Sequence, residues 1–336
     1  MLGFIALTGY IYYSYKFGSP DLGNNDFYRY KEMVEHPLDL SAVPAPFVLR
    51  QIPTFVAHLF YVFGIFYDTK TNLDFIVPTD DTTKRIFFAL ILSNAVAVGV
   101  SIVISMHYIR KRALNNDVII SFAYIGILLS YFYFPSSVIA PLTIGWGWLA
   151  TAVLTVALFE KRFLLFILGC LAALGTRETI LIFMLVFSIF SWASIARKER
   201  FYLGAALMLA ASCGALILAR IYLVHGYEDQ FDLHMNVTNV LAFRPSKEFI
   251  FQTIIPQAII FVLLVSVSIR HTSLAVALFA SMIAVLIIGL GTGERPGGIG
   301  RAIGETLPLY AIIFLLSRLR GLPACLAGVG DEHSGR

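Results

Sequence analysis

The sequence predicts an all-α membrane protein, a polytopic bundle of about ten transmembrane helices with interfacial helices in its first outer loop. Of its 336 residues, 58% are apolar and 14% are charged, and the mean hydropathy is +0.79. Soluble domains contain only about 45–50% apolar residues. The apolar residues also form continuous runs instead of the alternating pattern of a barrel strand. The spans are therefore predicted to be helices, which satisfy their backbone hydrogen bonds internally in lipid.

Charge and cysteine content argue against several other classes of protein. The formal net charge is +4, but the basic residues stand in small clusters at the ends of apolar runs, where they orient helices. Because they form no continuous stripe, we expect no nucleic-acid partner. The three cysteines, Cys170, Cys213 and Cys325, lack metal-ligand spacing and indicate neither a disulfide framework nor a zinc site.

The spans follow one another from the amino terminus. The first apolar run lacks the basic flank and cleavage site of a removable signal peptide, so we expect a retained helix. Residues 1–320 are expected to form one transmembrane domain, with 321–336 as a short cytoplasmic tail. At roughly 20 residues per span, the predicted spans lie at about 2–17, 86–109, 117–134, 137–158, 163–176, 179–196, 201–224, 249–269, 274–291 and 304–318.

The distribution of lysine and arginine predicts the orientation of these spans. The basic clusters end every second span from about residue 86 onward, and cytoplasmic connections carry such an excess. The predicted cytoplasmic set is Arg110, Lys111, Arg112, Lys161, Arg162, Arg197, Lys198, Arg200, Arg270, Arg318 and Arg320. The alternate connections carry the smaller set Arg177, Arg244, Lys247, Arg295 and Arg301. These alternate connections and the long loop 17–85 are therefore predicted to be outside.

A further apolar stretch at 47–67 has two interpretations. Polar residues and a proline interrupt it, while Phe47, Leu49, Phe55, Leu59 and Phe63 keep an apolar face. This pattern is typical of an amphipathic helix lying in the membrane interface, which we prefer. An additional ordinary span remains the alternative.

The first outer loop contains a candidate catalytic residue. Asp26 follows the predicted first helix within a few residues and stands beside Phe27 and Tyr28. A carboxylate held at the membrane surface can act as a general base toward a substrate hydroxyl. Alternatively, Asp26 caps a helix that begins at Phe27.

Two further outer connections carry charges close to predicted spans. Arg177 and Glu178 separate two apolar runs, and charges so close to hydrocarbon cost a few kcal/mol unless they are paired or face water. Arg177 could bind an anionic head group, or both residues could pair with neighbouring helices. Residues 291–301 form a predicted glycine-dense turn carrying Arg295 and Arg301. Exposed backbone amides and forked guanidinium groups suit a phosphate, although a plain hairpin turn explains the same sequence.

The loop at 225–248 gathers acids and histidines. Asp229, Asp232 and His234 are weak candidates for binding a divalent cation such as magnesium or manganese, which oxygen ligands favour. Their spacing matches no metal motif, so a solvated loop is the preferred interpretation.

Together these features resemble the GT-C type glycosyltransferases. The resemblance rests on the short first helix, Asp26-Phe-Tyr28 in a long outer loop, the segment from Pro44 to Pro53, the Arg177-Glu178 connection and a late outer arginine. Members of this family are polytopic membrane enzymes that transfer a sugar from a polyprenyl-phosphate carrier to an acceptor at the outer or lumenal face.

The resemblance implies specific roles and a location. Asp26 would be the catalytic acid or base, and the expected partners are a lipid-linked sugar donor and the bilayer. The chain would lie in a bacterial inner membrane with its active face outside, and partner membrane proteins are left open. The implied substrate-binding residues are Tyr28, Arg50, Arg177, Glu178, Arg295 and Arg301.

Two alternatives from other functional classes remain at this stage. One is polymerisation or ligation of lipid-linked glycans, which needs similar arginines but not Asp26. The other is a transporter or a structural subunit of a membrane complex. A shortage of charge near the middle of the spans argues against an ion-coupled transporter.

Overall fold

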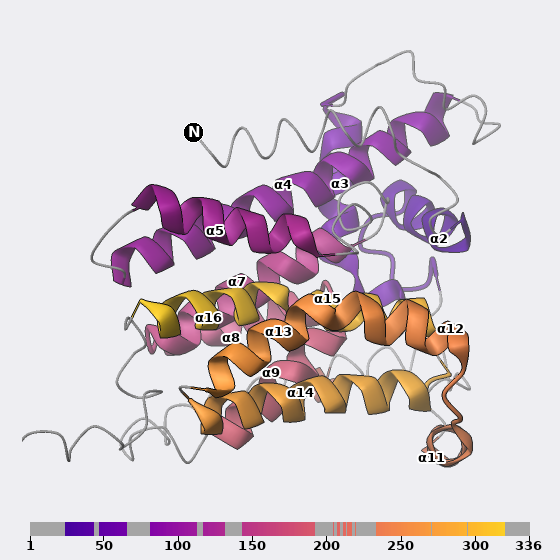
Figure 1. The fold of residues 1–336 in the computed structure, drawn as a ribbon. Helices are drawn as coiled ribbons and strands as arrows, with labels where there is room; N and C mark the ends of the chain where they lie inside the picture. The colour runs from indigo at the N-terminus through magenta and orange to yellow at the C-terminus, as the bar shows by residue number, and fades with distance from the viewer. Residues whose placement is uncertain are drawn as a thin grey trace, which may run out of the picture.

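The computed structural model describes residues 24–43, 47–65, 81–112, 117–131, 143–191, 233–269, 271–293 and 295–319, with single positions between 204 and 219. Every regular element in these ranges is helical, which confirms the predicted all-α class (Figure 1). The first five elements are α2 (Asn24–Glu35), η1 (Phe47–Leu49), α3 (Gln51–Val62), α4 (Asp81–Arg112) and α5 (Asp117–Ser130). They are followed by α7 (Ile144–Phe159), α8 (Phe163–Leu174), α9 (Glu178–Ser191) and α11 (Leu233–Ala242).

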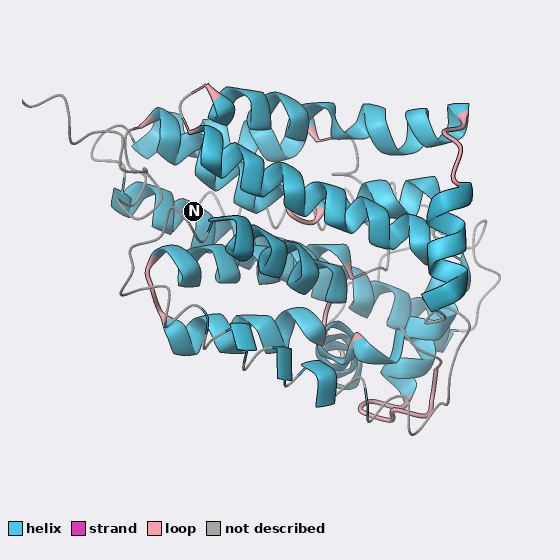
Figure 2. Cartoon of the chain, turned by 90° about the horizontal axis from the view of Figure 1, so that it is seen from below, coloured by secondary structure: helices cyan, strands magenta, loops and turns pink. Residues whose placement is uncertain are grey.

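The carboxyl-terminal part contains two interrupted helices. In the first, four helical elements of different type follow one another without a gap. They are α12 (Lys247–Phe249), η5 (Ile250–Ile254), η6 (Ile255–Gln257) and α13 (Ala258–Ser268). The uninterrupted helix α14 (Thr272–Gly291) comes next. The second interrupted helix consists of α15 (Pro296–Gly304) and α16 (Leu307–Arg318), which meet at a bend of 42°. Most of these helices run in one general direction across the molecule (Figures 1 and 2).

The length and apolar composition of several helices fit a membrane protein. The described residues contain fewer full-length spans, however, than the ten that were expected. Asp81–Arg112, Lys247–Ser268 and Thr272–Gly291 are long and apolar enough to cross a membrane, and the bent pair α15–α16 gives up to four. Helices α7, α8 and α9 are apolar but have 16, 12 and 14 residues. At about 1.5 Å per residue these reach roughly 18–24 Å, less than the about 30 Å of a hydrocarbon core. The predicted span at 2–17 lies outside the described residues, as do most residues of that at 201–224.

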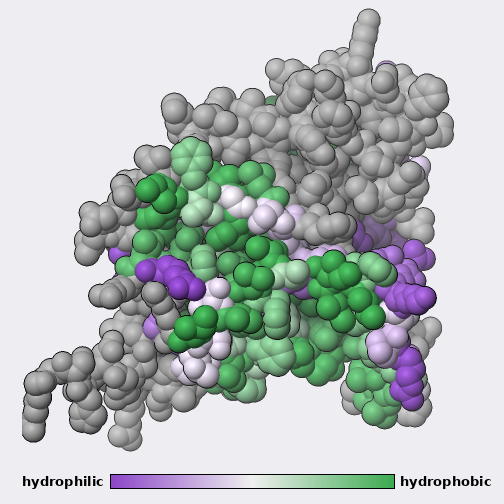
Figure 3. Space-filling model, in the orientation of Figure 1, coloured by the Kyte–Doolittle hydropathy of each residue, from purple (hydrophilic) through white to green (hydrophobic). Residues whose placement is uncertain are grey.

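The outer surface of the bundle is rich in apolar side chains. Exposed residues include Phe122 on α5, Phe261 and Val262 on α13, and Val276 and Phe279 on α14. Figure 3 shows a broad hydrophobic area between more polar ends. Lipid can cover such a surface, whereas a water-soluble monomer rarely exposes one.

Ionic contacts bring two of the predicted basic clusters to one end of the bundle. Glu160 follows α7 and lies 3.3 Å from Lys111 Nζ and 3.2 Å from Arg112 Nη2 at the end of α4. Helices α4 and α7 therefore end on the same side, as the alternating basic residues require. That this side faces the cytoplasm stays a prediction.

The segment predicted to be interfacial is divided into η1 and the 12-residue helix α3. At about 18 Å, α3 is too short to cross a bilayer alone. Its Pro53 and Ala57 are buried, whereas Phe55 and Leu59 are exposed. Phe47 and Leu49, which were predicted to share the apolar face of Phe55, are buried. That the segment lies in the membrane interface therefore stays a prediction.

Helices α3, α4 and α7 are joined by buried polar contacts. Trp146 Nε1 donates to Ser93 Oγ over 3.0 Å, and Ser93 Oγ donates to the Pro53 carbonyl over 2.9 Å. Next to these contacts, the Gly145 amide donates to Asn94 Oδ1 over 2.6 Å. A Cβ at Gly145 would lie 2.5 Å from that oxygen, so the close approach of α7 to α4 requires glycine.

Gly145→Ala should therefore destabilise the protein, because one methyl group must separate α4 from α7. We expect a loss of about 1–3 kcal/mol, as for overpacking elsewhere, measured by thermal unfolding in detergent. Gly126→Ala on α5 is the matched control, since a Cβ there meets nothing within 4 Å. Equal unfolding temperatures for both variants would contradict the requirement for glycine at position 145.

The Glu160 contact should depend on pH. Burial alone raises the pKa of the Glu160 carboxyl, but hydrogen bonds from Lys111 and Arg112 outweigh it and hold the pKa below its usual value. The contact therefore stabilises the fold above the unfolded pKa of about 4.3 and is lost as pH falls through the lower folded value. The stability difference between the parent and Glu160→Gln should shrink between about pH 5 and pH 3. A constant difference would contradict this assignment.

Candidate functional site

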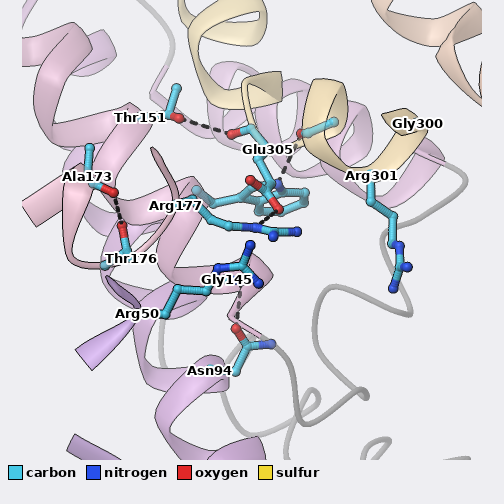
Figure 4. A network of polar contacts seen from close by, with 12 residues as sticks. Arg50, Asn94, Gly145, Thr151, Ala173, Thr176, Arg177, Gly300, Arg301 and Glu305 are labelled. Atoms are coloured by element: carbon cyan, nitrogen blue, oxygen red, sulfur yellow. Dashed lines mark hydrogen bonds and ion pairs between the residues drawn. The ribbon is translucent and has the colours of Figure 1, made fainter. Parts of the chain in front are cut away.

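The candidate site is an arginine cluster of Arg50, Arg177 and Glu305, located at the end of the bundle opposite Glu160. Arg50 precedes α3, Arg177 precedes α9, and Glu305 lies at the bend between α15 and α16. The Ile52 amide donates to the Gly175 carbonyl over 3.1 Å, which fixes the start of α3 against the α8–α9 turn. Figure 4 shows the side chains of Arg50 and Arg177 extending into the same region.

Arg177 and Glu305 form a buried ion pair. Arg177 Nε donates to Glu305 Oε1 over 2.7 Å, and their side chains are 12% and 0% exposed. Removing one partner from such a pair typically destabilises a protein by about 3–5 kcal/mol, because the other charge stays buried. The pair therefore ties the α8–α9 turn to the α15–α16 bend, 128 residues later in the chain.

The bend that carries Glu305 is held by hydrogen bonds to its backbone. Thr151 Oγ1 donates to the Glu305 carbonyl over 3.0 Å, and Trp148 Nε1 donates to the Gly304 carbonyl over 3.1 Å. Both donors come from α7. Their hydrogen bonds satisfy carbonyls that the bend would otherwise leave without partners.

The glycine-dense turn predicted at 291–301 is helical from Pro296 onward, contrary to expectation. Proline is well suited to the first turn of a helix, and buried partners stabilise the later turns of α15. Tyr131 Oη and Gln257 Nε2 both donate to the Gly300 carbonyl, over 3.2 Å and 2.6 Å. A Cβ at Gly304 would collide with the Tyr131 ring. The glycines in α15 thus allow close packing.

The structure places Arg295 and Arg301 apart from the Arg177 pair. Arg295 is exposed and immediately precedes α15. Arg301 Nε donates within its own helix to the Gly297 carbonyl over 3.4 Å, and the side chain extends away from Glu305 (Figure 4). The surroundings of Arg295 and Arg301 therefore differ from those of Arg177.

Arg50 is the second buried arginine, with 6% of its surface exposed. Its Nη1 donates to Tyr30 Oη over 2.7 Å, and its guanidinium lies 5.1 Å from the centre of the Phe47 ring. The Arg29 guanidinium also lies over Phe47, at 4.4 Å. These contacts anchor α2 to the start of α3 through aromatic and cationic groups.

Asp26 lies in the first turn of α2 and is partly buried. Because α2 begins at Asn24, Asp26 is not the cap of a helix starting at Phe27, and the predicted capping role is wrong. Asp26 precedes Tyr30 by one turn and shares its helix face. Phe27 packs edge-on against Phe87, whereas Tyr28 is 54% exposed.

Several predicted site residues lie outside the described side chains. Glu178 begins α9, and His234 lies in α11, but only their backbones are described. Asp229 and Asp232 lie outside the described residues altogether. Within the described part of the chain, no three metal-ligating side chains are grouped closely enough to hold an ion.

Sequence reasoning did not identify Tyr30 and Glu305 as site residues. A signal for Glu305 was present, because an acid between Gly304 and Thr306 at the start of an apolar run must find a partner. Its pairing with Arg177, however, depends on a contact between distant segments. No comparable sequence signal pointed to Tyr30, which stands among other aromatic residues in the loop.

Comparisons with known proteins add no family assignment. No family model matches the chain, and neither the curated proteins nor the solved structures compared with it include a match.

Proposed function

We propose that the protein is a GT-C-like glycosyltransferase that transfers a sugar from a polyprenyl-phosphate donor to an acceptor at the outer face of a membrane. The supporting observation is that the buried Arg50 and the largely buried Arg177 occupy the bundle end to which α2 and Asp26 are anchored. Buried guanidinium groups can stabilise negative charge that develops on a departing phosphate. Bacterial inner-membrane location and outward orientation belong to this proposal.

The proposed reaction is a single displacement with inversion at the anomeric carbon. Asp26 accepts the proton of the acceptor hydroxyl while the new bond forms between the acceptor oxygen and the sugar. The bond from the sugar to the carrier phosphate breaks, and the carrier leaves with the bonding electrons. Arg177 and Arg50 provide positive charge on the leaving side, and Tyr28 offers an exposed aromatic surface for a sugar ring.

Arg295 and Arg301 have a lesser role in this proposal. Arg301 extends away from Glu305 and Arg295 precedes α15, at the same bundle end as Arg177, so both remain candidates for contacts with the donor. A divalent cation, if the reaction requires one, would be bound by Asp229, Asp232 and His234. A lipid-linked glycan polymerase or ligase remains the second interpretation, since it would use the arginines without Asp26.

Asp26→Asn should abolish most transfer while leaving the fold intact, because asparagine cannot accept the acceptor proton. We expect sugar transfer from radiolabelled polyprenyl-phosphate hexoses and pentoses to fall by roughly 10²–10⁴ in reconstituted vesicles. Glu32→Gln is the matched control, since Glu32 is an exposed acid on the same helix. Parental activity in Asp26→Asn would exclude a catalytic role and favour the polymerase-like interpretation.

Arg177→Gln tests the buried arginine, but it also leaves Glu305 without its cation. We expect this single variant to lose about 3–5 kcal/mol of stability. Arg177→Gln combined with Glu305→Gln should recover most of the stability, because two amides can replace the pair by a neutral hydrogen bond. Donor binding should stay weak in the double variant if Arg177 contacts the carrier phosphate. Full recovery of both stability and donor binding would assign Arg177 a structural role alone.

A further inference from the structure

Helix α11 lies beside the carboxyl-terminal end of α14, with its axis crossing the direction of the bundle. Figure 1 shows α11 end-on below its neighbours, and Figure 2 shows the same helix lengthwise, crossing the direction of the others. It packs against the end of α14, where Asn239 Nδ2 donates to the Gly291 carbonyl over 2.9 Å. Because α14 is long and apolar enough to span a membrane, its end marks the level of the membrane surface.

The two faces of α11 differ in an unusual way. Asn236, Asn239 and Val240 lie toward α14, with Asn236 and Val240 close to Gly291. The opposite face carries Val237 and Leu241, which are 50% and 74% exposed. Among the side chains described from residue 236 onward, the exposed face also carries Thr238 but is more apolar than the packed face, whereas a helix in water shows the reverse.

Basic residues and exposed apolar residues continue directly from α11. Arg244 and Lys247 follow it and are exposed. Beyond them, Phe251 and Ile254 of η5 are exposed. They lie near the start of the helical segment Lys247–Ser268, which is also long enough to span a membrane. Figure 3 shows apolar surface at the position of α11 beside a strongly polar edge.

We propose that α11 is an interfacial helix that lies flat on the outer leaflet, with Val237 and Leu241 inserted and Arg244 and Lys247 bound to anionic phospholipid head groups. The crosswise axis, the outward apolar face and the adjacent cations are the combination that characterises such helices. The nearby acid Glu248 accepts a hydrogen bond from Gln252 over 3.1 Å. This assignment replaces residues 233–242 of the solvated loop predicted for 225–248 and does not depend on the proposed transferase activity.

Depth-dependent fluorescence quenching tests the insertion of α11. In full-length protein with Cys170, Cys213 and Cys325 replaced by alanine, a single cysteine at Val237 or Leu241 is labelled with the fluorophore NBD. In vesicles of phosphatidylcholine and phosphatidylglycerol, emission should shift to the blue. Nitroxide lipids labelled at about carbon 5 should quench more strongly than those labelled at about carbon 14, because interfacial helices insert only about 5–10 Å.

A label at Glu32→Cys is the control for a water-exposed position on α2, and lipid nitroxides should not quench it. Three results would overturn the insertion of α11. The Val237 and Leu241 labels could respond like the control, which places them in water. They could shift to the blue without lipid quenching, which indicates a protein partner or a second copy. Stronger quenching from the deeper nitroxide would place them deep in the hydrocarbon.

Brominated lipids test the charge preference. Brominated phosphatidylglycerol should quench a Leu241 label more efficiently than brominated phosphatidylcholine. Arg244→Gln with Lys247→Gln should reduce this preference, by roughly fivefold for each basic residue removed. Arg162→Gln, an exposed position at the opposite end of the bundle, controls for the loss of charge. An unchanged preference in the double variant would show that these cations do not bind head groups.

Discussion

The buried pair between Arg177 and Glu305 is the constraint on which the described structure most depends. A charge in this environment is tolerated only with its counter-charge close by, and the two residues belong to distant segments. Forming the pair requires the α8–α9 turn and the α15–α16 bend to meet beside α7. Once they meet, Thr151 and Trp148 donate hydrogen bonds to the backbone of the bend. These bonds determine the direction in which α16 leaves the bend.

The same constraint explains why polar groups recur within an otherwise apolar bundle. Hydrogen bonds from Ser93, from Tyr131 and to Asn94 join helices at points where two backbones come close. In lipid, apolar contacts alone discriminate poorly between helix faces, since the surroundings are equally apolar. Directional polar contacts and small residues therefore specify which helices pair.

The sequence was informative where a single segment contains the whole signal. Continuous apolar runs predicted α4 and α14, and the interrupted apolar stretch at 47–67 predicted a short helix, which α3 provides. It failed for α15, because Gly297, Gly298 and Gly300 indicate a turn unless the contacts of Tyr131 and Gln257 with Gly300 are known. The candidate site was only partly accessible for the same reason. Arg177 was recognisable as a costly charge, whereas its partner Glu305 and the contact between Arg50 and Tyr30 became evident only from tertiary contacts.

The length of helix α4 also indicates where the arginine cluster lies along the membrane normal. Asn94 bonds to Gly145, and a Cβ two residues further, at Gly147, would lie 3.1 Å from Glu305. The ion pair is therefore level with Asn94. From Asn94 to Arg112, α4 rises about 27 Å, close to the thickness of a hydrocarbon core. If the basic end lies at one polar boundary, Arg177 and Glu305 lie at the other, and the first few turns of α4 extend beyond the hydrocarbon on the side of α2. An amphiphile whose chains remain in the bilayer would thus present its head group at the height of the pair without leaving its leaflet.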